Sequence, residues 1–265
     1  MSTATGLRRL LVENRQVVFL EALATAAALW WLASAGFGLT DTLSSPPLVA
    51  AAVAELLASG EWVPHFSATG RRIAYGFAIS TVLGTAFGLL MGLYGFWEKV
   101  FQDYITVGLA FPSVFIALFA AMAFGVGDTA PTVTAGIAPF PFVAQNVYQG
   151  VNNVDTGLLE MARSFEVSRI RTLGRVVFRS VLPEWFAGVR YGFAGAWKLV
   201  TLAEAIAAEQ GVGFMIQTEL TRLSMTGVLA WTVLFGAVIA VFEYLVLRRI
   251  EERVFDWREQ SAVAW

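Results

Sequence analysis

The stretch "LLEMARSFEVSRIRTLGRVV", residues 158–177, is a basic insert in a chain that is otherwise strongly apolar. It contains Arg163, Arg169, Arg171 and Arg175, whereas the segments on either side of it carry almost no charge. Of the 265 residues, 57% are hydrophobic and 14% are charged, and a typical soluble domain has about 25% charged residues. The polar residues are too few to cover a soluble globule of this size, so the composition predicts a membrane protein.

Six apolar segments are long enough to cross a membrane, because a spanning helix needs about 20 apolar residues. Helices are predicted throughout, since the alternating pattern of barrel strands is missing. The spans are predicted at about residues 17–38, 73–94, 100–124, 129–148, 185–207 and 228–247. The first is too long for the apolar core of a signal peptide and is predicted to be retained. The sequence thus predicts an all-α polytopic membrane protein with a single domain over residues 1–265, and a short outer helix that opens at Pro46 and Pro47.

The basic residues decide which connections are cytoplasmic, because cytoplasmic loops are enriched in lysine and arginine. Basic residues precede the first span, separate the second from the third and the fourth from the fifth, and follow the sixth. The connections on the other side carry mainly acidic residues, namely Asp41, Glu55, Glu61, Asp128, Glu209 and Glu219. Both termini are therefore predicted to be cytoplasmic.

Small residues recur at every fourth position in two of the predicted spans. They are Gly84, Gly88 and Gly92 in the second span and Gly188 and Gly192 in the fifth. Such a strip lets another helix backbone approach closely. Packing within the chain is the favoured interpretation, and a contact between two copies of the chain is the alternative.

Prolines and polar side chains inside the spans indicate where a pathway through the membrane would lie. Pro112 interrupts the third span, and Pro131, Pro139 and Pro141 interrupt the fourth. Broken backbone at membrane depth is tolerated where protein buries it or where it lines a water-filled path. Ionisable residues at that depth usually face a cavity or a partner, although a lysine can also extend to the interface. The candidates for a pathway or gate are Pro112, Gln145, Asn146, Lys198 and Glu204.

The sequence offers little for catalysis or for cofactor binding. His65 is the single histidine, in a predicted outer loop, and no carboxylate cluster accompanies it at metal-ligand spacing. Cysteine is absent, and so is the GxxxxGK[ST] phosphate loop, so the chain is predicted to have no catalytic or metal site and to bind no ATP itself. The net charge of −2 gives no indication of a nucleic-acid partner.

The basic insert has the pattern of two short helices within a cytoplasmic loop at about residues 152–183. Asp155 is positioned to cap the first helix. Its apolar face consists of Leu158, Met161, Ala162 and Phe165, at positions i, i+3, i+4 and i+7. The second helix is predicted to start at Ser168, with arginines around an apolar side. Such a hairpin can rest on anionic lipid headgroups or fit a groove on a soluble partner.

Three segments of the sequence resemble a known family. "EMARSFEVSR" (160–169), followed by "VLPEWFAGVRYGFAGAW" (181–197), resembles the cytoplasmic EAA loop and the next helix of permease subunits of bacterial ABC importers, especially the nitrate/sulfonate/taurine group. "LAEAIAAEQGVGFMI" (202–216) resembles the outer connection of that group, and the collinear resemblance covers about residues 17–258. It implies a type I ABC importer permease fold in the bacterial plasma membrane.

The resemblance also implies roles and partners. In the family, the loop docks into a cleft on the ATP-binding subunit and carries ATP-driven motion to the membrane helices. The coupling positions would be Asp155, Leu158, Glu160, Met161, Ala162, Arg163, Ser164, Phe165 and Ser168. The implied partners are a second copy of this chain or a similar permease, two cytoplasmic ATPase subunits that bind ATP and Mg²⁺, and an extracytoplasmic solute-binding protein.

The loop departs from the family pattern at two places. Glu166 stands where the family usually has glycine between the two loop helices, and Phe178 and Arg179 stand where it usually has a first Leu-Pro. Because a positive φ costs glutamate roughly 1 kcal/mol more than glycine, we expect the bend to be made differently here.

The substrate is only broadly indicated. Lys198 suits a small anion such as nitrate, a sulfonate or taurine, while a series of phenylalanines in the third span does not exclude a thiamine precursor or riboflavin. The alternatives to an importer are a passive channel and an intramembrane enzyme.

Overall fold

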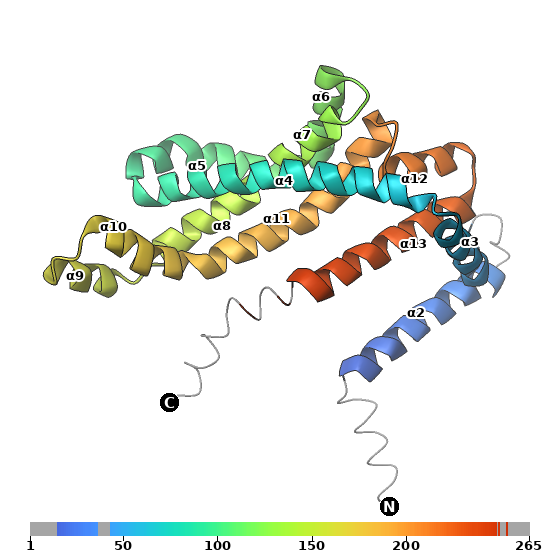
Figure 1. Cartoon of the computed structure of the whole chain (residues 1–265), viewed down its shortest axis with the longest axis horizontal. Coiled ribbons are helices and arrows are strands. Elements are labelled where there is room, and N and C mark those ends of the chain that lie inside the picture. Colours follow the sequence, from blue (N-terminus) through green and yellow to red (C-terminus); the bar gives the residue numbers. More distant parts are fainter. Residues whose placement is uncertain (1–14, 37–42, 248, 250–252, 254–265) are drawn as a thin grey trace, which may run out of the picture. The chain divides into compact units, whose positions relative to one another are not determined.

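The computed structural model describes residues 15–36 and 43–247, together with residues 249 and 253. Its described elements are helices, in agreement with the predicted all-α class, and no strand occurs among these residues (Figure 1). The predicted membrane orientation rests partly on residues that lie outside the described part of the chain, including Arg8, Arg9, Asp41, Arg248 and Arg258. Both termini lie outside it as well. The chain forms two compact units, residues 1–61 with 216–235 and residues 62–215 with 236–265.

The first unit contains α2 (Arg15–Gly36) and α3 (Pro46–Ser59). As predicted, α3 opens with its two prolines, which suit a first turn because the backbone N–H groups there have no helical partner. The indole of Trp30 donates to the Ser44 carbonyl at 3.1 Å, and the Ser44 hydroxyl bonds that of Thr226 at 2.7 Å. These bonds hold the segment before α3 within its own unit.

The second unit is built around α4 (Trp62–Leu93), α8 (Phe140–Asn152) and α11 (Phe178–Ala207). The glycine strip of α4 faces a valine strip of α8, since Cβ atoms added to Gly84, Gly88 and Gly92 would lie 2.5–2.6 Å from the Cβ atoms of the facing valines. Those valines are Val143, Val147 and Val151. On α11, Gly188 faces Asn146 of α8. Small residues therefore bring both neighbouring helices close to α8.

Proline positions agree with the breaks in the third and fourth predicted spans. The helices α5 (Gly95–Ala110) and α6 (Ser113–Phe124) meet at an angle of 97° beside Pro112, as its missing N–H predicts. The fourth span is divided into α7 (Thr129–Ile137) and α8, with the break at Pro139. Pro131 lies in the first turn of α7 and leaves that helix intact, because no N–H is needed there.

By length and apolar composition, fewer helices of the structure qualify as membrane spans than the six predicted from the sequence. Among the described residues, three helices qualify, Val17–Ala35, Trp62–Leu93 and Met225–Leu247, and up to five if each bent pair is one span. The bent pairs are α5 with α6, and Arg169–Ala207 with α12 (Val212–Thr221) at 51°. The predicted count of six spans stays a prediction. The last helix, α13 (Met225–Phe242), continues into one π-helical turn, η2 (Glu243–Leu247).

The basic insert forms α9 (Thr156–Ser164) and α10 (Arg169–Thr172), at one end of α11 (Figure 1). The second helix of the insert does not end before the fifth span. It continues through a π-helical turn, η1 (Leu173–Val177), into α11, so that Arg169–Ala207 is one helix with Pro183 inside it. Pro183 lies beyond the π-helical turn, and the helix continues through it.

Candidate functional site

The hairpin of α9 and α10 is anchored to the core of the second unit. As predicted, Asp155 caps α9, and its Oδ1 accepts a hydrogen bond from the Gly157 N–H at 2.7 Å. Leu159 packs against a buried valine cluster that includes Val154 and Val177. Ala162, predicted on the same apolar face as Met161, is buried. One side of α9 is thus fixed to the protein body.

Three large apolar side chains on α9 and at its C-cap are exposed, and we call them the α9 ridge. They are Leu158, Met161 and Phe165, and Met161 and Phe165 are 51% and 77% exposed. Ile170 at the start of α10 is exposed as well. The surrounding arginines are also exposed, namely Arg163, Arg169, Arg171, Arg175 and Arg179. An apolar ridge flanked by cations has the composition of a docking surface.

The bend between the two helices is made by Glu166 itself. Its φ is 53°, in the left-handed region, so the expectation that the bend would be made differently was wrong. The N–H of Glu166 donates to the Arg163 carbonyl at 3.0 Å, and that of Val167 donates to the Ala162 carbonyl at 2.9 Å. This is the Schellman pattern, whose two hydrogen bonds satisfy helix-end carbonyls. These bonds offset the roughly 1–2 kcal/mol that the left-handed conformation costs.

The other coupling candidates lie on the same hairpin. Glu160, Ser164 and Ser168 are exposed, and the Ser164 hydroxyl donates to the Glu160 carbonyl at 3.0 Å. Ser168 occupies the N-cap position of α10, and its carbonyl accepts from the Thr172 N–H at 3.0 Å. The structure therefore brings all nine residues of the predicted coupling set onto one hairpin.

The candidates for a pathway do not form one cluster. Gln145 and Asn146 are partly buried on α8, and the amide of Asn146 donates to the Phe142 carbonyl at 2.8 Å. Pro112 lies at the exposed break between α5 and α6. Lys198 is exposed on α11, whereas Glu204, two turns further along the same helix, is fully buried. Lys198 and Glu204 lie on different faces, as their spacing predicts.

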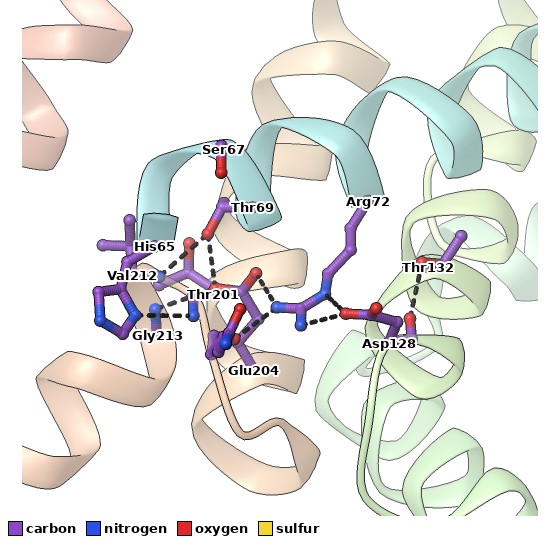
Figure 2. A network of polar contacts seen from close by, with 12 residues as sticks. His65, Ser67, Thr69, Arg72, Asp128, Thr132, Thr201, Glu204, Val212 and Gly213 are labelled. Carbon is purple, nitrogen blue, oxygen red and sulfur yellow. Dashed lines mark hydrogen bonds and ion pairs between the residues drawn. The ribbon is translucent and has the colours of Figure 1, made fainter. Parts of the chain in front are cut away.

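Glu204 belongs to a buried polar network at the end of α11 (Figure 2). Its Oε1 accepts from Arg72 at 2.7 Å, and its Oε2 accepts from the Thr69 hydroxyl at 2.9 Å and from the Gly213 N–H at 3.0 Å. The Thr69 hydroxyl in turn accepts from the Val212 N–H at 3.0 Å. The carboxylate and the hydroxyl thus satisfy two orphan donors at the start of α12.

Glycines let the backbone reach this carboxylate. Gly211 has a φ of 124°, which disfavours other residues, and a Cβ there would overlap the carboxyl group of Glu204. A Cβ on Gly213 would overlap the Thr201 carbonyl. The sequence from Glu204 to Gly213 therefore specifies a turn that folds back onto its own glutamate.

Sequence reasoning missed most members of the network. It placed His65 in a loop without a task, but His65 lies on α4, and its Nδ1 accepts from the Gly211 N–H at 3.2 Å. It did not single out Arg72, which is buried between Glu204 and Asp128. An arginine just before an apolar span, in a chain with a deep glutamate, was the available signal.

A second ion pair was missed in the middle part of α11. Nε of Arg190 donates to Oε1 of Glu243, the first residue of η2, at 2.9 Å. Both side chains are partly exposed. Each residue lies within a predicted span, where an unpaired charge would be costly.

Comparison with known proteins agrees with this arrangement. Residues 80–256 match the family described as "Binding-protein-dependent transport system inner membrane component". The putative aliphatic sulfonates transport permease protein SsuC of Escherichia coli K12 is 30% identical over 239 residues, covering 90% of this chain and 88% of that protein. The taurine transport system permease protein TauC of the same organism is 28% identical, covering 92% and 91%.

Solved structures share the fold. An inward-facing structure of the MetNI methionine ABC transporter aligns with a TM-score of 0.64 at 17% sequence identity, covering 73% of this chain and 95% of the matched chain. The family match spans well over half of the chain, including the α9–α10 hairpin and the Glu204 end of α11. The chain therefore belongs to the inner membrane components of binding-protein-dependent transport systems, the permease subunits of ABC importers.

Proposed function

We propose that this permease carries a small organic sulfonate such as taurine across the bacterial plasma membrane. The names of its relatives SsuC and TauC support this substrate class. In this proposal the chain works as one permease domain beside a second copy of itself. Two separate cytoplasmic ATPase subunits bind ATP and Mg²⁺, and an extracytoplasmic protein delivers the solute. The chain itself moves solute and makes or breaks no covalent bond.

The α9 ridge is the observation that carries the proposal. Apolar side chains that water covers in the isolated chain become favourable contacts in a cleft on a partner. The arginines around the ridge would orient the two proteins. Since Arg169–Ala207 is one helix, a movement of the hairpin is transmitted directly to α11. ATP-driven closure of the ATPase pair would thus switch the permease between two conformations.

The orientation follows from the same assignment. The hairpin and both termini lie in the cytoplasm, and the connections at the opposite ends of the helices face outward, in accord with the distribution of arginines. Because the chain has no cysteine, Ser59→Cys and Ser168→Cys variants can be labelled singly with an impermeant thiol reagent. Labelling from opposite sides of the membrane is expected, and labelling from the same side would reject this orientation.

The exposed Lys198 gives the pathway a cation that can attract a sulfonate. It lies inside the fifth predicted span, and its side chain is exposed on α11. A charged side chain at that depth is stable beside water or a partner rather than beside lipid. Together with Gln145 and Asn146 on the adjacent α8, it would line part of the route.

Reconstitution tests the proposal. The permease, the ATPase encoded with it and a sulfonate-binding protein are placed in liposomes, and uptake of labelled taurine is measured. Uptake that depends on ATP and on both partners is expected. Uptake without ATP would indicate a channel, and conversion of taurine by the purified chain would indicate an enzyme.

The ridge is tested separately by measuring binding of the ATPase subunit to detergent-solubilised permease. Burial of a phenylalanine side chain stabilises by about 1.5–3 kcal/mol, and Phe165 is 77% exposed before binding. Phe165→Ala should therefore weaken ATPase binding by about 1–2 kcal/mol, or roughly 5–30-fold. Leu223→Ala is the matched control, because Leu223 is also a large, exposed apolar residue but lies after α12. Equal losses in the two variants would contradict the assignment.

A further inference from the structure

Arg72 is buried at the end of α11 that lies opposite the hairpin, and its guanidinium contacts three acceptors at once (Figure 2). Nη1 donates to Glu204 Oε1 at 2.7 Å and to the Gln210 carbonyl at 2.6 Å. Nε donates to Oδ1 of Asp128 at 2.8 Å, and Nη2 contacts the same oxygen. A planar guanidinium fixes the directions of all these bonds, which a lysine would not do.

Asp128 and Gln210 belong to two separate turns, and Glu204 lies at the end of α11. Residues 125–128 connect α6 to α7, and residues 208–211 connect α11 to α12. A backbone bond from the Gly127 N–H to the Ala207 carbonyl, of 2.8 Å, also joins them. The two turns present exposed side chains above the buried guanidinium. We call this surface the outer rim, and its exposed residues are Val126, Asp128, Glu209 and Gln210.

The contacts that Arg72 makes with Glu204 and Asp128 are ionic rather than apolar. Burying a guanidinium and a carboxylate costs several kcal/mol per ion, and apolar side chains commonly join two helices equally well. An arginine offers what apolar contacts lack, a fixed orientation between several acceptors on different segments. The side chain of Asp128 is 72% exposed although it bonds the buried Arg72. The contact between Arg72 and Asp128 therefore connects the buried core to the exposed surface.

We propose that Arg72 is a positioning residue that holds the two turns as one preformed surface on which the solute-loaded binding protein docks. The inference rests on the proposed function, which places the hairpin in the cytoplasm. With 30 residues, α11 is about 45 Å long, so its Glu204 end lies on the side from which a binding protein delivers solute. A surface that is already ordered loses less conformational entropy when a partner binds.

The test measures ATP hydrolysis and uptake by proteoliposomes as a function of the concentration of loaded binding protein. Arg72→Lys keeps a cation but loses the planar fork, and Asp128→Asn removes the charge of a side chain that is 72% exposed. Both variants should raise the apparent KM for the loaded binding protein about tenfold, the effect of losing a charge-assisted hydrogen bond. The rate at saturation and the basal ATPase rate should stay unchanged.

Arg71→Met is the matched control, because Arg71 is the adjacent arginine of α4 but is exposed. It should leave the KM unchanged. A merely structural role for Arg72 would lower thermal stability and the saturating rate without a selective change in KM. Unchanged KM values in Arg72→Lys and Asp128→Asn, with binding-protein dependence in the wild type, would overturn this inference alone. A wild type that ignores the binding protein would overturn the proposed function as well.

Discussion

Adding one methyl group to the glycine strip of α4 should separate α4 from α8. We consider Gly84→Ala, in the interior of α4. The new Cβ would lie 2.6 Å from Val143 Cβ, 2.9 Å from Val143 Cγ1 and 3.1 Å from the Phe140 carbonyl oxygen. Carbon atoms in contact prefer about 3.5–4.0 Å. The two helices therefore have to move apart by about 1 Å, or the buried valine has to leave its position.

The expected change in the stability of the chain is the difference between two opposing effects. Overpacking of this kind costs about 1–3 kcal/mol, while replacing glycine by alanine inside a helix gains up to about 1 kcal/mol. Gly70→Ala in the same helix isolates the gain, because an added Cβ there meets nothing within 4 Å. Gly84→Ala should thus be less stable than Gly70→Ala by about 1–3 kcal/mol.

The assay is unfolding of the purified chain in mixed micelles by titration with sodium dodecyl sulfate. In a Val143→Gly background the cost of Gly84→Ala should fall below about 1 kcal/mol, since the two closest atoms that the methyl group meets, Val143 Cβ and Cγ1, are removed. Equal stabilities of Gly84→Ala and Gly70→Ala would refute the packing argument. Loss of association between copies with unchanged stability of the chain would do so too, and would favour a seam between copies.

Two further changes test other features of the second unit. Glu166→Gly should slow amide exchange at the α9–α10 bend relative to Glu166→Ala, because only glycine removes the cost of the left-handed backbone conformation, about 1–2 kcal/mol. Amide exchange is measured by mass spectrometry, and equal exchange rates in the two variants would contradict this prediction. Arg190→Met and Glu243→Gln should each destabilise the chain, and the double variant should be less destabilised than their sum by about 0.5–3 kcal/mol; strictly additive unfolding free energies in the micelle assay would argue against a functional ion pair.

Local signals in the sequence predicted the hairpin and the helix breaks. Asp155 at an N-cap and the 3.6-residue spacing from Leu158 to Phe165 depend on neighbours within two turns, so they could be read directly. Pro112 acts through its own missing N–H and predicted the bend after α5. These features need no information about distant parts of the chain.

Features that depend on distant partners could not be predicted. The second span was expected to start at residue 73, but α4 starts at Trp62, because His65, Thr69 and Arg72 find polar partners from Asp128 to Gly213. Glu166 was misjudged for a related reason. Its unfavourable φ was visible as a local cost, whereas the two hydrogen bonds that compensate it appear only when the bend is formed. Sequence spacing showed that Glu204 does not pair with Lys198, but it could not identify Arg72 as the partner.

The continuity of Arg169–Ala207 has a geometrical consequence for transport. A helix of this length extends about 60 Å, so a tilt of about 5° at its Arg169 end displaces the other end by about 5 Å, close to one helical pitch. A small angular change at the hairpin end is thus amplified into a displacement of several ångströms at the other end of the helix. The π-helical turn and Pro183 lie toward the Arg169 end of this helix. A slight change of curvature there therefore has a large effect on the position of the Ala207 end.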